Sequence, residues 1–255
     1  MRTVIALSMS VALLGGLFAQ DAKSLLKQSQ QKYRQMKSME ASITINAEIS
    51  QGSNTIKQQL RSTLAMQKPN QLAMKASGNS PMASREIYSD GKEMIIYLPA
   101  MKQYVKRPAP PDFEGPAAST LGELGMLLSF ANENLDDPNS KAKYAFKGKK
   151  TINGKPMRII EVSEKQQHAS SVIRLYVGEQ DKLIYRLEMD QSMQQPAQQG
   201  QSPQRFAMKV EADIRYISFN KPIPASRFKF TPPKDAKPMQ IPQQGTPAPP
   251  PQGQK

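Results

Sequence analysis

The sequence predicts a mainly β protein of the α+β class, built on one large antiparallel sheet of about ten to eleven strands. Apolar and polar residues alternate with a period of two over most of the chain. Asp90-Gly91 and Asn153-Gly154 stand between such stretches and are typical of tight hairpin turns. Only two segments show helical spacing. Strands this amphipathic form a sheet with one face buried against the core and one face exposed to solvent.

The first nineteen residues predict export. Met1-Arg2 supplies a positive start, residues 3–19 carry no charge, and the segment ends in the small residue Ala19. The apolar stretch is shorter than the roughly 20 residues that a membrane-spanning helix needs. We therefore expect residues 1–19 to be a signal peptide that is cleaved after Ala19, which predicts a periplasmic protein. An uncleaved membrane helix is the alternative.

A helix and a long strand are expected to follow the signal peptide. Asp21 is placed to cap a helix whose apolar stripe lies on one face. The stripe consists of Ala22, Leu25, Leu26, Tyr33 and Met36. From Met39 to Ser50 the period changes to two, which predicts a half-buried strand.

Nine further strands are predicted by the same alternation. They are centred on residues 56–66, 72–76, 85–89, 94–97, 144–146, 157–160, 173–177, 183–189 and 206–216. Short turns separate most of them, so an antiparallel order is expected.

A short apolar helix interrupts the strands. Thr120 and Glu123 have the spacing of a capping box, and four leucines follow the helical period. These are Leu121, Leu124, Leu127 and Leu128. A Pro-rich stretch precedes the segment 121–130, and an Asn-rich stretch follows it. It is either a core helix that plugs one end of the sheet or a movable lid, and composition does not separate the two.

Two low-complexity stretches complete the domain plan. Residues 191–204 are rich in Gln and are expected to form a long loop between the last two strands. Residues 237–255 are rich in Pro and Gln and are expected to be a disordered tail. The folded domain is therefore predicted to span residues 20–236.

The residue inventory argues against most catalytic chemistry. The chain has no Cys and a single histidine, His168, so thiolate sites and multi-His metal centres are excluded within one chain. No serine lies in a nucleophile-elbow pattern. A glycosidase with two carboxylates needs neither Cys nor His and stays open, although no Trp platform supports it. We expect a protein that is not an enzyme and has no cofactor.

Charge and methionine content point to binding. Lys and Arg total 35 against 21 Asp and Glu, a net charge of +14, which suggests anionic partners or surfaces. Many of the 15 Met lie on predicted strands, and Met suits surfaces that accept varied apolar partners. Ordinary core filling is the alternative. The positions expected to face one interior, and to line a cavity, are Ile43, Ile45, Leu60, Leu64, Met74, Ile96, Leu175, Leu187, Met208 and Val210.

Five motifs in order carry a resemblance to the periplasmic lipoprotein carrier family LolA. They are the helix of residues 21–39, the strand of residues 40–50, Lys68-Pro69-Asn70, Ser89-Asp90-Gly91-Lys92, and Phe228-Lys229-Phe230-Thr231-Pro232-Pro233. The resemblance implies a half-open antiparallel β-barrel around an apolar cavity, with helices as a lid. It also implies that the basic residue before Pro-Asn, here Lys68, helps to control the lid. In the familiar carriers this residue is an arginine.

The function expected from these observations is an exported carrier or chaperone that holds acyl chains of lipids or lipoproteins in an apolar cavity. The resemblance implies an inner-membrane donor protein and an outer-membrane acceptor protein. We expect a monomer that does not bind nucleic acid. Two alternatives stay open: an envelope-stress sensor with the same fold, and a basic scaffold that binds anionic envelope polymers.

Overall fold

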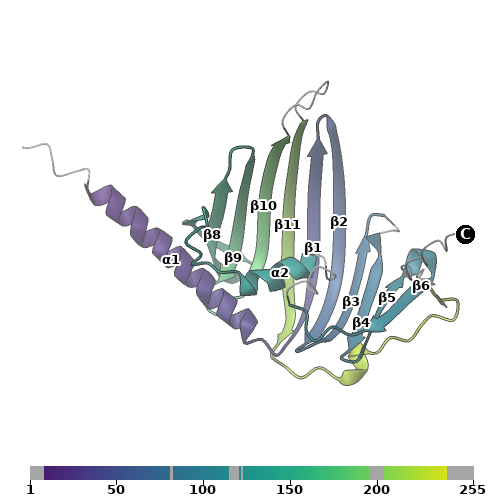
Figure 1. Ribbon diagram of the computed structural model, residues 1–255. Coiled ribbons are helices and arrows are strands. Elements are labelled where there is room, and N and C mark those ends of the chain that lie inside the picture. The colour runs from purple at the N-terminus through teal and green to yellow at the C-terminus, as the bar shows by residue number, and fades with distance from the viewer. Residues whose placement is uncertain (1–8, 81–82, 115–120, 122, 196–203, 240–255) are drawn as a thin grey trace, which may run out of the picture.

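The computed structural model describes residues 9–80, 83–114, 121, 123–195 and 204–239 of the 255-residue chain. Its strands form a single twelve-stranded sheet in the order β12-β6-β5-β4-β3-β2-β1-β11-β10-β9-β8-β7 (Figure 1). The strands are β1 (Ser38–Gln51), β2 (Asn54–Gln67), β3 (Gln71–Gly78), β4 (Arg85–Asp90), β5 (Glu93–Leu98), β6 (Gln103–Pro108), β7 (Lys143–Ile152), β8 (Lys155–Lys165), β9 (Ala169–Gly178), β10 (Ile184–Gln195), β11 (Gln204–Phe219) and β12 (Lys237–Pro238). The helices are α1 (Met9–Arg34) and α2 (Glu123–Asn132).

The sheet is curved but does not close. Its neighbouring strands are antiparallel, except that β12 lies parallel to β6. β7 and β12 form the two edges, and β1 pairs with β11 near the middle. The predicted half-open antiparallel architecture with an N-terminal helix and a second short helix is confirmed.

All ten predicted strands are present, and the structure adds two. β6 was missed because its short alternation around Tyr104 and Val105 ends at Pro108, in a stretch that reads as a Pro-rich linker. The loop expected over residues 191–204 is shorter, because β10 extends to Gln195 and β11 begins at Gln204. The residues between them lie outside the described part of the chain.

Two predicted boundaries also change. α1 begins at Met9, so Asp21 lies inside a continuous helix and does not cap its start. The start of the expected disordered tail was placed too early, since Lys237 and Pro238 pair with Gln103 and Tyr104. The rest of the expected tail lies beyond Met239, outside the described residues. Within the described residues, no helix has the length and apolar character to cross a membrane.

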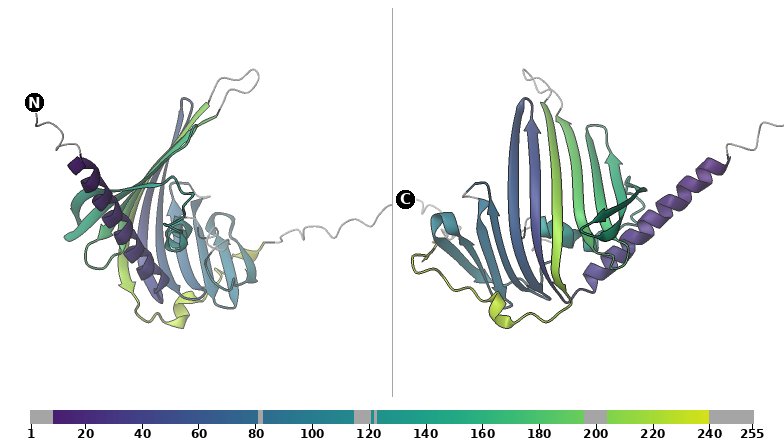
Figure 2. Two further views of the ribbon diagram at one scale, coloured as in Figure 1. Left: turned by 60° about the vertical axis from the view of Figure 1, so that its left-hand side comes forward. Right: turned by 180° about the vertical axis from the view of Figure 1, so that it is seen from behind.

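The two faces of the sheet differ in chemistry and in what covers them. Both helices lie on one face, here called the inner face (Figures 1 and 2). In β1, Ile43 and Ile45 are buried on this face, whereas Thr44 and Asn46 point to the opposite, outer face. The helices bury the central part of the inner face in one large hydrophobic cluster.

α1 is fixed to the sheet by a buried hydrogen-bond network. The hydroxyls of Tyr33 and Tyr216 lie 2.5 Å apart. The amide of Ile184 donates to the Tyr33 hydroxyl at 2.9 Å, and the Tyr216 hydroxyl donates to the Ile184 carbonyl at 2.8 Å. Burial raises the pKa of both tyrosines well above the ordinary value, so both stay neutral. This network sets the position of the C-terminal half of α1.

The C-terminal Phe-x-Phe motif builds a second, smaller core on the outer face. Phe228 is 1% exposed and packs with Ile223 against Ala65 and Ala73. The ring of Phe230 lies near three tyrosines of neighbouring strands: Tyr88, Tyr97 and Tyr104, at centroid distances of 5.2, 5.5 and 6.0 Å. The motif therefore ties the C-terminal segment across β4, β5 and β6.

Candidate functional site: the inner apolar face and its helical cover

The structure places all ten predicted cavity positions in one hydrophobic cluster on the inner face. The buried members are Ile43, Ile45, Leu64, Met74, Leu175 and Val210. The partly buried members, which pack against the cluster, are Leu60, Ile96, Leu187 and Met208. Contact of these side chains with a ligand stays a prediction.

α2 covers the inner face and is held at its C-terminal end. Leu121, Leu128 and Ala131 are buried in the cluster. The side chains of the other two predicted lid residues, Leu124 and Leu127, lie outside what the structure describes. The Gln30 amide of α1, which is only 2% exposed, donates to the carbonyls of Phe130 and Glu133 at 2.8 and 3.0 Å. These are carbonyls that the end of a helix leaves without partners inside the helix.

A second group of contacts joins the sheet to both helices through Lys68. The Lys68 Nζ atom lies 3.2 Å from Glu114 Oε1 and donates to the Arg34 carbonyl, at the end of α1, at 3.3 Å. Glu114 Oε2 accepts a hydrogen bond from Asn132, the last residue of α2, at 3.3 Å. Lys68, Glu114 and Asn132, here called the latch, thus link the end of β2 to the end of α2. Sequence reasoning singled out Lys68 but not Glu114 or Asn132, which lie 46 residues or more away in the chain.

A small cavity lies between the latch and the hydrophobic cluster. Its volume is about 270 Å³. Its walls are Tyr33, Met66, Phe113 and Leu128, with the latch at one end. Small-molecule pockets in proteins usually span about 300 to 1,000 Å³. With α2 in this position, the cavity is below the size that a long acyl chain requires.

The apolar inner face extends beyond the cover. Ala47, Leu60, Ile173, Leu187 and Met208 pack against the cluster but keep part of their surface exposed. Above α2, the long strands β1, β2, β10 and β11 continue with neither helix in front of them (Figure 1). The cover therefore leaves an open apolar margin beside α2.

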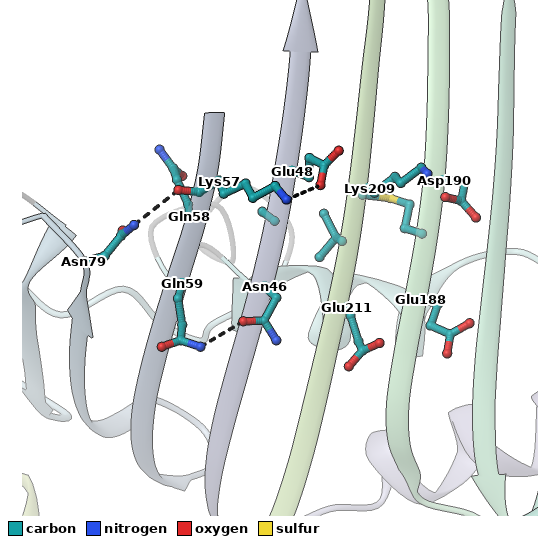
Figure 3. Close-up of a pocket in the computed structure, with 13 residues that line it drawn as sticks. Asn46, Glu48, Lys57, Gln58, Gln59, Asn79, Glu188, Asp190, Lys209 and Glu211 are labelled. Carbon is teal, nitrogen blue, oxygen red and sulfur yellow. Dashed lines mark hydrogen bonds and ion pairs between the residues drawn. The ribbon is translucent and has the colours of Figure 1, made fainter. Parts of the chain in front are cut away.

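The outer face carries a polar hollow of about 450 Å³ instead (Figure 3). Lys57 lies 3.5 Å from Glu48, and Gln59 donates to Asn46 at 3.0 Å. The other polar walls are Asn79, Glu188, Asp190, Lys209 and Glu211. In the described part of the chain, no group of three or more His, Asp or Glu residues could hold a metal ion. The alternation predicts that these side chains face outward, but no sequence signal marks the hollow.

Charged residues of neighbouring strands pair across the rest of the outer face. Arg174 lies 3.1 Å from Glu161 and 3.4 Å from Asp190. Burial, and secondly the hydrogen bond to Glu188, raise the pKa of Tyr176 to about 12. His168 is exposed in the turn between β8 and β9. The ion pairs of Arg174 join charged residues of neighbouring strands.

Several solved structures are similar to this chain at low sequence identity. LprF from Mycobacterium bovis is 12% identical, with 86% of this chain and 98% of that chain covered and a TM-score of 0.46. A LolA superfamily protein from Nitrosomonas europaea is 10% identical, with 82% and 97% covered and a TM-score of 0.33. The MucA/MucB complex from Pseudomonas aeruginosa is 11% identical, with 87% and 64% covered and a TM-score of 0.41.

Sequence comparison identifies the family. A protein of Methanocaldococcus jannaschii, described as uncharacterized, is 26% identical over 244 residues, which is 91% of this chain. The chain spans 60% of the length of that relative. The family model described as "Predicted periplasmic protein (DUF2092)" matches residues 22–242. The chain therefore belongs to this family of periplasmic proteins.

Proposed function

We propose that this periplasmic protein is a carrier that binds acyl chains of lipids or lipoproteins on its inner face, and that it is not an enzyme. The observation that carries the proposal is the open apolar margin beside α2, whose residues pack against the hydrophobic cluster. A soluble protein that exposes a continuous apolar surface uses it for binding.

The chemistry of the inner face suits a flexible apolar ligand. Each buried methylene group contributes about 0.8 kcal/mol, so an acyl chain can bind tightly without polar contacts. The described strands contribute six methionines to the cluster on the inner face, and methionine side chains adapt to ligands of different shape. They are Met39, Met66, Met74, Met94, Met189 and Met208.

Binding of a whole acyl chain requires α2 to move, because the closed cavity of 270 Å³ is too small. The contacts of Gln30 hold the C-terminal end of α2 in the closed position. The side chains of Lys68 and Glu114 are 28% and 48% exposed. Ion pairs this exposed contribute about 0–1 kcal/mol, so the latch opens at little cost.

The proposal includes transfer between two membrane partners, a donor protein at the inner membrane and an acceptor at the outer membrane. A sensor of the same fold would bind the same acyl chains but would signal to one membrane protein instead of passing the ligand on. An assay that follows a labelled lipid from the donor protein to the acceptor protein separates these two functions, because a carrier transfers the lipid and a sensor does not.

The test uses protein purified from the periplasm. Native mass spectrometry should detect bound acyl species, and the purified protein should bind a fluorescent fatty acid that unlabelled fatty acid displaces. Leu60→Asp, at the partly exposed margin, should abolish displacement at an unchanged melting temperature. The neighbouring outer-face variant Gln59→Asp is the matched control and should bind normally. An empty protein, or a Leu60→Asp variant that binds as the wild type does, would refute the proposal.

The role of α2 is tested separately. If α2 is a lid, Leu124→Asp with Leu128→Asp should abolish fatty-acid binding and leave the sheet folded. If α2 is a core plug, the same change should unfold the protein, because a charge then replaces Leu128, which is 6% exposed.

A further inference from the structure

The far end of the inner face carries large apolar side chains that are exposed. In the register of the sheet, Ile49 lies opposite both Ile56 and Met208, and Phe206 lies opposite Met193. Ile56 is 58% exposed and Met193 is 46% exposed. We call Ile56, Met193 and Phe206 the apolar tip. Figure 2 (left) shows this end of β1, β2, β10 and β11 projecting away from both helices.

A shallow hollow adjoins the apolar tip. It has a volume of about 370 Å³, and Met193 and Phe206 form its apolar wall. The opposite wall is polar and includes Glu164, Ser171 and Gln191. The tip is therefore an amphipathic surface at the end of the strands, away from the cavity under α2.

Two exposed cations lie at the same end of the sheet as the apolar tip, and strand alternation directs their side chains to the outer face. Lys165 ends β8 and Arg205 lies at the start of β11, and both are exposed. Within the described residues neither forms an ion pair, whereas Lys57 nearby is paired with Glu48. The whole chain carries a net charge of +14. An end of the sheet with exposed apolar side chains on one face and unpaired cations on the other complements an anionic lipid surface that it enters edge-on.

We propose that the apolar tip docks on the surface of an anionic phospholipid bilayer. Ile56, Met193 and Phe206 enter the interface between headgroups and acyl chains, and Lys165 and Arg205 contact lipid phosphates. Each such cation strengthens binding by about fivefold. The inference goes beyond the proposed function, because docking does not require that the inner face carries a ligand. In a carrier, it would bring the open margin next to the bilayer.

The test is sedimentation with vesicles of phosphatidylethanolamine and phosphatidylglycerol, mixed roughly three to one, against vesicles of phosphatidylcholine alone. Protein purified from the periplasm should bind the anionic vesicles and be released by salt. Ile56→Asp with Met193→Asp should lower the partition coefficient by about tenfold or more, because the charges keep the tip out of the interface. Lys165→Glu with Arg205→Glu should lower it at least about 25-fold.

Matched controls use the opposite end of the sheet. Ile217 is 65% exposed in β11, so Ile217→Asp removes an equally exposed isoleucine. Arg215→Glu with Lys229→Glu makes the same change of charge at exposed positions. Both controls should bind vesicles as the wild type does.

Three results would overturn the proposal: no binding to anionic vesicles, equal losses in the tip variants and their controls, or a dimer in solution that Ile56→Asp dissociates. The last result would assign the tip to a second copy of the chain. The same variants should displace fatty acid normally when the assay contains no vesicles. The two assays therefore distinguish a failure of docking from a failure of the carrier function.

Discussion

Gln30→Leu tests how α2 is held on the sheet. Leucine has a similar size and suits a helix, but it removes both hydrogen bonds that the Gln30 amide donates to the end of α2. Gln30 is 2% exposed, so water does not readily replace its amide.

The magnitude follows from the two lost contacts. A typical hydrogen bond contributes about 1 kcal/mol net, so the pair stabilises the closed position by about 2 kcal/mol. If α2 opens as a lid, this loss makes opening about thirtyfold more favourable. Because the closed lid competes with the ligand, apparent fatty-acid affinity should rise by up to the same factor.

Hydrogen exchange and fatty-acid titration measure the two effects. Amides of α2 should exchange up to about thirtyfold faster in Gln30→Leu, while amides of β1 and β11 change much less. Gln31→Leu is the control, because Gln31 is the next residue in α1 and is exposed. If α2 and the central strands lose protection equally, and affinity does not rise, α2 opens only with global unfolding and the lid mechanism is wrong.

Three further predictions concern the anchor of α1, the response to alkali and the N-terminus. Tyr33→Phe should lower the free energy of unfolding by about 1–3 kcal/mol in urea titrations, because it leaves the buried Ile184 amide without its acceptor. Tyr144→Phe is the control, since Tyr144 is a half-buried ring at the edge of the sheet. An equal loss of stability in the control would contradict the prediction. Burial raises the pKa of Tyr33 and Tyr216, so at high pH the folded state keeps protons that the unfolded state releases. The contribution of these two tyrosines to stability should therefore be constant below about pH 10 and fall as the pH rises further toward the raised pKa values. A flat stability profile from about pH 9 to pH 12 would argue against this prediction. N-terminal sequencing of exported protein should begin at Gln20, and retention of residues 3–19 would show that no signal peptide is removed.

Much of the strand content could be predicted because alternation is a local property. In β1, each residue points to the face opposite its neighbour, so Ile43 and Thr44 could be assigned to different faces without knowing any partner strand. The same holds for the stripe that buries Tyr33. Prediction failed where local signals conflict, as in β6, which is short and ends in proline.

The candidate site could be predicted only in part. The ten cavity positions lie in one cluster because each has the correct parity in its strand. Lys68 was identified through the resemblance of its motif, but its partners Glu114 and Asn132 were not, since neither lies in a motif.

The sequence by itself determined which strand side chains face inward, where ten of the twelve strands lie, and that the chain carries a strongly basic balance. Only the tertiary structure decided that β1 pairs with β11, that Tyr33 meets Tyr216 from 183 residues away, and that the cover ends below the apolar tip. The physical reason is the range of the interactions. The alternation of side chains depends on the backbone of one strand. The order of the strands and the position of the helices over the sheet depend instead on contacts between distant segments. No local pattern encodes the loop-closure cost and the packing energy of those contacts.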